Sequence, residues 1–159
     1  MLGLAGIGEE RLHLAWVSSA EAHRFVEVAT SLTNSIKDQG KFDQEAFALE
    51  LGAAEMTLKD EILRWMVGKE IKITQDGDVY GRKWDLEKYE SILDSVLERE
   101  YHKNLIYLAI KEGLTSVREI NTRIGLDLQL ISRLIADMEK TSKVEFTGME
   151  NRTPVFAAL

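Results

Sequence analysis

The chain has 159 residues, of which 45% are hydrophobic and 30% are charged, a balance typical of a folded globular protein. It has no cysteine, which excludes disulfides, thiolate metal sites, cysteine-ligated iron–sulfur clusters and cysteine nucleophiles within these residues. The net charge of −7 is unevenly spread: residues 1–100 carry 12 basic and 20 acidic side chains, and residues 101–159 carry 8 and 7. The acidic excess argues against a long nucleic-acid footprint in the first hundred residues.

The N-terminal residues 1–8 are apolar but have neither a basic leader nor a cleavage pattern, so they do not predict a signal peptide. No apolar run approaches the roughly 20 residues that span a bilayer. We therefore expect a cytoplasmic protein without membrane insertion. One proline and eleven glycines predict helices joined by short connections.

The first element in the chain is a predicted short strand over residues 12–17, followed by a helix. Ser18 or Ser19 is the expected N-cap, Glu21 completes a capping box, and Gly40 ends the helix. This strand and helix are typical of the end of a domain, so we expect the beginning of that domain upstream.

The middle of the chain predicts two short helices and a hairpin. In order, the pattern indicates helices over 42–51 and 58–67, ended by Gly52 and Gly68, and strands over 71–74 and 79–82. The strands enclose Asp76-Gly77, which favours a tight hairpin turn. With the preceding helix, this order also fits a winged-helix-like unit.

The last part of the chain has the clearest pattern. It predicts a long helix from Asp85 to Gly113, with or without a break near 99–102, then helices over 117–124 and 128–140 and strands over 144–146 and 154–156. Gly125 makes the turn between the two shorter helices, and Leu134 faces the core. This order is that of a winged helix-turn-helix. The predicted fold is therefore mainly α with small β-hairpins, containing one winged helix-turn-helix or two in tandem.

These predicted elements divide the chain into three segments. Residues 1–40 hold the terminal strand and helix, residues 41–84 a helical unit with a hairpin, and residues 85–159 the winged-helix domain.

No constellation of residues predicts catalysis or metal binding. The three histidines, His13, His23 and His102, lie on different predicted elements without ligand spacing. Ser18 and Ser19 lack the glycine pattern of a nucleophile elbow, and acidic pairs are expected to be solvated. The three tryptophans are expected to pack in a core. We expect no catalytic, cofactor-binding or metal residue, and no enzyme activity of the chain by itself.

The outer face of the 128–140 helix is the candidate contact surface. Gln129, Ser132, Arg133 and Ala136 lie on it, and Arg152 lies near the tip of the hairpin. Arginine and glutamine bond base edges, which suits DNA. However, the face also holds acidic residues that repel phosphate, and DNA affinity rests largely on dense basic clusters. The sequence therefore leaves two candidates for the molecule that this face binds, a protein partner and DNA.

Residues 6–40 carry a further pattern, which resembles the C-terminal end of the delta subunit of methyl-viologen-reducing hydrogenase. The matching features are Gly6-Ile7, Glu10-Arg11-Leu12, Leu14, Trp16-Val17-Ser18, Glu21, Phe25 and Glu27. That family occurs as a free subunit or fused to proteins of the heterodisulfide reductase type.

The resemblance implies a role in electron transfer. Family members pass electrons from hydrogenase to heterodisulfide reductase through a cysteine-ligated iron–sulfur cluster upstream of the matching segment. The chain has no cysteine, so we expect any cluster in a missing upstream region and regard the chain as a fragment of an oxidoreductase subunit. The expected function is a non-catalytic C-terminal docking module that binds protein subunits of a redox complex; the alternative is a winged-helix transcriptional regulator.

Overall fold

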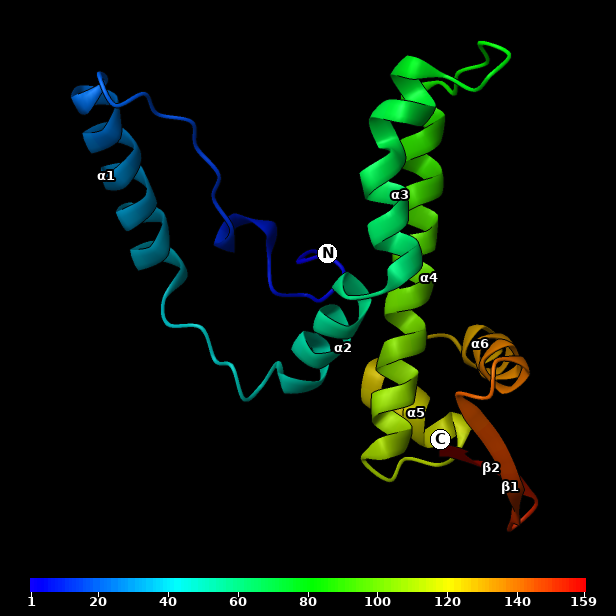
Figure 1. Ribbon diagram of the computed structural model, residues 1–159. Coiled ribbons are helices and arrows are strands. Elements are labelled where there is room, and N and C mark those ends of the chain that lie inside the picture. Colours follow the sequence, from blue (N-terminus) through cyan, green and yellow to red (C-terminus); the bar gives the residue numbers. More distant parts are fainter. The chain divides into compact units, whose positions relative to one another are not determined.

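A computed structural model describes residues 1–159, and its fold is mainly α. The helices are α1 (Ala22–Gln39), α2 (Ala48–Leu58), α3 (Glu61–Ile71), α4 (Leu86–Lys111), α5 (Val117–Ile124) and α6 (Leu128–Lys140), with a 3-10 turn η1 (Glu9–Arg11) and a π-helical turn η2 (Lys72–Asp76). One antiparallel sheet contains β1 (Val144–Glu150) and β2 (Thr153–Ala158) (Figure 1). The chain divides into two compact units, Met1–Ala48 and Leu49–Leu159. None of its helices has an apolar stretch sufficient to cross a membrane.

The predicted strand over residues 12–17 is wrong, because these residues form no ladder with any other segment. A strand needs a neighbour for its backbone N–H and C=O groups, and this unit supplies none. The helix that follows is confirmed, but the expected N-cap at Ser18 or Ser19 is wrong, because α1 begins at Ala22 with Glu21 at the N-cap position and no side chain bonded there. Half of the expected capping box forms: the Glu21 carboxylate accepts from the Ser18 backbone N–H at 3.0 Å. Gly40 ends α1 with φ 70°.

The two short helices of the middle segment are confirmed as elements, but their boundaries move. Gly52 lies inside α2 and does not end it. A Cβ at this glycine would meet Leu108 Cδ1 at 3.1 Å, so the missing side chain permits close packing against α4. Asp60 begins α3 by accepting from the backbone N–H groups of Ile62 (2.9 Å) and Leu63 (3.2 Å).

The predicted hairpin over residues 71–82 is wrong. α3 continues through Gly68 to Ile71 and passes into η2, whose last bond runs from Gly77 N–H to Lys72 O over 2.8 Å. The chain does reverse after Asp76, but a loop replaces the strands. Asp78 Oδ1 accepts two loop N–H groups, from Tyr80 and Arg82, both at 2.9 Å. These side-chain bonds satisfy backbone N–H groups of the loop, and no strand ladder forms there. Residues 41–84 therefore lack the hairpin that a winged-helix unit requires.

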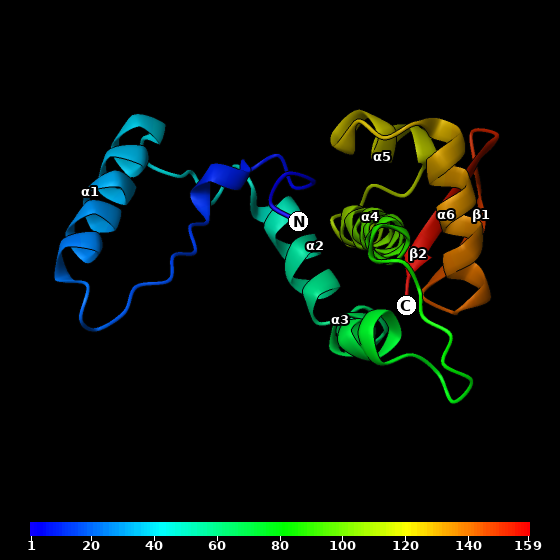
Figure 2. The same ribbon diagram turned by 90° about the horizontal axis from the view of Figure 1, so that it is seen from above.

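The last segment follows the prediction closely. α4 is unbroken from its N-cap Asp85 onward. It lies beside α3 in its first half and against α5, α6 and β2 in its second half (Figure 1), and a view along its axis shows these neighbours around it (Figure 2). The core of this half is aliphatic: Ile106, Ala109, Ile110, Ile120, Ile131, Leu134, Ile135, Met138 and Val144. Leu134 is buried as predicted.

Helices α5 and α6 and the hairpin of β1 and β2 have well-formed ends. Ser116 caps α5 with a complete capping box, and Gly125 follows in the left-handed region with φ 71°. Asp127 caps α6. Asn151 and Arg152, both at positive φ, turn β1 into β2.

Candidate functional site

The predicted contact residues on α6 all point to solvent. Gln129, Ser132, Arg133 and Ala136 are exposed, whereas the opposite face of the helix is buried in the core. The phase of the helix therefore agrees with the predicted outer face. The Ser132 hydroxyl donates to the Leu128 carbonyl over 2.9 Å, which leaves it free only as an acceptor.

The charge of this face is nearly balanced. Lys140 Nζ bonds Asp137 Oδ1 at 3.0 Å, and this hydrogen bond, with the lysine charge, holds the pKa of Asp137 below its usual value. Glu139 is exposed nearby. Arg133 has no ion-pair partner and is the one free cation of the outer face. A single free arginine on a face that also holds carboxylates makes a weak attraction for a polyanion.

Arg152 lies on the exposed turn of the hairpin, at φ 65°. No hydrogen bond or ion pair connects it to α6. The hairpin also presents apolar side chains: Phe146 is 51% exposed and Met149 is 59% exposed. Phe146 packs edge-on against Phe156, with ring centroids 6.0 Å apart.

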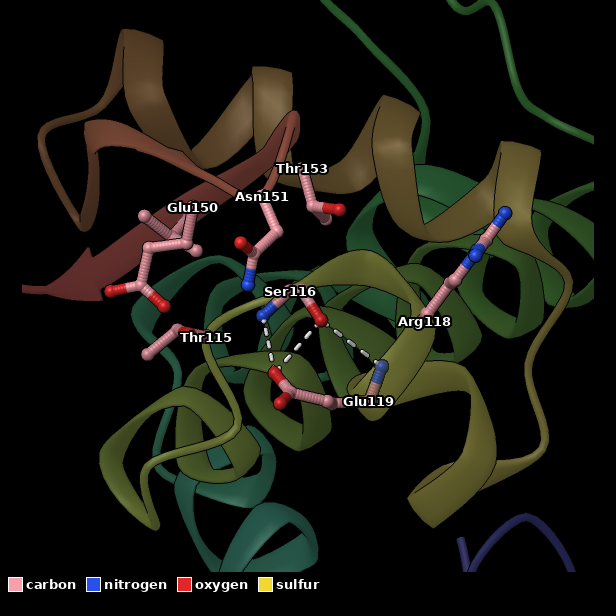
Figure 3. Close-up of a pocket in the computed structure, with 8 residues that line it drawn as sticks. Thr115, Ser116, Arg118, Glu119, Glu150, Asn151 and Thr153 are labelled. Atoms are coloured by element: carbon pink, nitrogen blue, oxygen red, sulfur yellow. Dashed lines mark hydrogen bonds between the residues drawn. The ribbon is translucent and has the colours of Figure 1, made fainter.

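A small polar hollow of about 190 Å³ lies where the hairpin meets the start of α5 (Figure 3). Ser116 and Glu119 bond each other in the capping box, and this lowers the pKa of Glu119. Glu150 lines the same hollow, so two carboxylates face it. The N-terminus of α5 is already satisfied by its own cap, and we assign this hollow a structural role.

A larger hollow of about 850 Å³ lies between α3, η2, the loop after η2 and the first half of α4. Its walls are Ile62, Trp65, Met66, Lys69, Lys72, Ile73, Gly77, Asp78, Arg82, Trp84, Tyr89 and Ile92. We did not predict this site from the sequence, because we expected the tryptophans to be buried. That expectation is wrong: Trp16, Trp65 and Trp84 are 81%, 58% and 46% exposed.

The floor of this hollow is fixed by Tyr89, which is almost fully buried. Its hydroxyl donates to the Met66 carbonyl and so joins α4 to α3. Burial, and next the charge of Glu70, raise the pKa of Tyr89. The tyrosine therefore stays neutral and holds the two helices together.

No three His, Asp or Glu side chains gather in an arrangement that could hold a metal ion. His23 pairs with Glu27 at 3.2 Å, and His13 lies 3.5 Å from the Ser35 hydroxyl. Burial lowers the pKa of His102, against the opposing charge of Glu98. As predicted, the three histidines belong to different segments: His13 precedes α1, His23 lies in α1 and His102 lies in α4.

Comparisons of the chain with models of protein families, with curated proteins and with solved structures find no match.

Proposed function

We propose that residues 85–159 form a winged helix-turn-helix whose α6 face and hairpin dock a protein partner. In this proposal the chain is the non-catalytic C-terminal module of an electron-transfer subunit, and the partner is a protein subunit of a hydrogenase/heterodisulfide reductase-type complex. The identity of the complex rests on the resemblance of residues 6–40 to the hydrogenase delta subunit.

The winged-helix assignment is supported by the order of the elements and by the hydrogen bonds that connect them. α4, α5, a left-handed glycine turn, α6 and the β1–β2 hairpin follow in the order of that fold. A bridge between Ser116 and Val155, and a bond from Phe156 N–H to Thr115 O (2.9 Å), attach the hairpin to the start of α5. These backbone contacts hold the hairpin beside the start of α5.

The near-neutral outer face of α6 is the observation that carries the docking proposal. Arg133 is its one free cation, since Lys140 is paired with Asp137. A DNA reader gains much of its affinity from several phosphate contacts, which this face does not provide. The exposed Phe146 and Met149 on the hairpin instead resemble the aromatic and methionine side chains enriched in protein interfaces.

A specific observation also favours the alternative, a DNA-binding regulator. Gln129 and Arg133 are exposed on the first two turns of the helix that follows the glycine turn, where a recognition helix contacts bases. The two functions differ in their dependence on salt, because each phosphate contact adds about 0.9 to the slope of log affinity against log salt.

The test measures the affinity of the same variants for a protein partner and for DNA. We expect the chain to bind purified heterodisulfide reductase or hydrogenase subunits, and Met149→Ser together with Arg133→Ala to weaken that binding. Arg64→Ala, which removes an exposed arginine on α3, serves as the control. Tight binding to a selected duplex at physiological salt, with a steep salt slope and a loss of about 1–3 kcal/mol on Arg133→Ala, would establish the regulator instead.

A further inference from the structure

The hollow between α3 and α4 has the dimensions and the lining of a ligand site. Its volume of about 850 Å³ lies within the range of roughly 300–1,000 Å³ that small-molecule sites occupy. Seven of its residues are apolar or aromatic: Ile62, Trp65, Met66, Ile73, Trp84, Tyr89 and Ile92. Such walls stabilise the apolar part of a ligand by removing its surface from water.

The charged residues of this hollow are mostly basic. Lys69, Lys72 and Arg82 line it against one carboxylate, that of Asp78. Asp78 is already engaged, because its Oδ2 accepts from Arg82 Nε over 2.7 Å. Lys69 and Lys72 have no ion-pair partner. The charges that line the hollow are therefore net positive, although the charge of Glu70 also acts on Tyr89 at its floor and residues 1–100 hold 20 acidic against 12 basic side chains.

Along the wall that α3 and η2 form, apolar side chains come first and cationic side chains follow, and Ile73 and Trp84 add apolar surface beside the lysines. Along α3 and η2, Ile62, Trp65, Lys69 and Lys72 follow at helical spacing, with the lysines last. The loop after η2 closes the lysine end, where Trp84 N–H donates to Ile73 O over 3.0 Å. The wider turn of η2 lies at this same end, and π-helical turns often occur at functional sites.

We propose that this hollow binds a small amphiphilic anion. The ligand's apolar chain or ring packs against Trp65 and Trp84, and its carboxylate or phosphate head lies between the ammonium groups of Lys69 and Lys72. Lysine is a compact, mobile cation that suits either head group. The site is separate from the α6 face and does not depend on the docking function.

Calorimetric titration of the full chain with decanoate, decyl phosphate and 1-decanol, below the micelle-forming concentrations, tests the proposal. The three probes share one apolar chain and differ in the charge of the head. We expect decanoate or decyl phosphate to bind at least about tenfold more tightly than 1-decanol, as a charge-assisted contact requires. The stronger of the two anions identifies the preferred head group.

Variants separate the contributions of head and chain. Lys69→Gln with Lys72→Gln should weaken binding of the anion by about tenfold and leave 1-decanol unchanged, whereas Trp65→Ala should weaken binding of all three probes. Lys41→Gln with Lys143→Gln is the matched control for a loss of two charges elsewhere, and thermal melts verify folding. Equal binding of decanol and the anions, unchanged binding in the Lys69/Lys72 variant, or no binding at millimolar concentration would overturn the proposal.

Discussion

Asn104 and Thr57 are joined by a buried hydrogen bond that links α4 to α2 across 47 residues of sequence. Asn104 Nδ2 donates to Thr57 Oγ1 over 2.9 Å, and the same hydroxyl donates to the Ala53 carbonyl over 2.7 Å. Both side chains lie inside the protein. The pair therefore fixes where α2 lies along α4, and the Thr57 hydroxyl is used both as a donor and as an acceptor.

Replacing Thr57 by valine should destabilise the protein by about 1–3 kcal/mol, because the Asn104 amide would remain buried without this acceptor. Thr122→Val is the matched control. The Thr122 hydroxyl also donates to the carbonyl four residues earlier, at 2.9 Å, but it is exposed. Chemical denaturation of both variants makes the comparison. Equal losses in the two would show that the bond between the helices contributes nothing.

Leu134→Ala should cost about 2–5 kcal/mol, since Leu134 is buried in the aliphatic core between α4 and α6 and its truncation leaves a cavity. Leu128→Ala on the same helix serves as the control, because Leu128 is exposed. Denaturant melts at one pH provide both values. A loss below about 0.5 kcal/mol at Leu134, typical of a surface substitution, would contradict this packing.

Tyr101 should make the protein less stable in alkali. Its ring is buried and its hydroxyl has no hydrogen-bond partner; burial and then the charge of Glu50 raise its pKa from the ordinary value of 10.0 to about 12. The folded state therefore retains the proton after the unfolded state has lost it. The contribution of Tyr101 to the free energy of unfolding is fully present below pH about 10. The free energy of unfolding then falls by about 2–3 kcal/mol as the pH rises toward 12.

Tyr101→Phe should remove most of this alkaline loss and cost little at neutral pH, because the hydroxyl makes no bond. Urea denaturation of both proteins between pH about 8 and pH about 12 measures the difference. Tyr89, whose pKa is also raised, contributes to the slope that remains. An unchanged slope in the variant would show that Tyr101 is not the titrating group.

Ser116→Ala should destabilise the protein by about 1 kcal/mol, because it removes the hydroxyl of the α5 capping box. Ser116→Thr keeps the hydroxyl and should restore most of the stability. The lowered pKa of Glu119 gives the pH dependence: the stabilisation is present above the ordinary glutamate pKa of 4.5 and is lost as the pH falls through the folded value. Thermal melts at pH about 7 and about 3 compare the three proteins.

Local signals in the sequence determined most helix boundaries after residue 59. Asp85, Ser116 and Asp127 begin helices because a capping side chain bonds N–H groups only two or three residues later. Gly125 makes its turn for an equally local reason, the left-handed backbone. The outer face of α6, with Gln129, Ser132 and Arg133, was predictable for the same reason, since helical periodicity alone sets which residues face the core.

Only the tertiary structure decided the features that depend on distant neighbours. Residues 12–17 have strand-like composition but no partner to complete a ladder, and Asp76-Gly77 turns the chain without a hairpin because Asp78 satisfies the loop. Gly52 stays inside α2 because Leu108 packs against it. The hollow lined by Trp65 and Trp84 exists because α3 and α4 lie side by side, a pairing that no periodicity in either helix specifies.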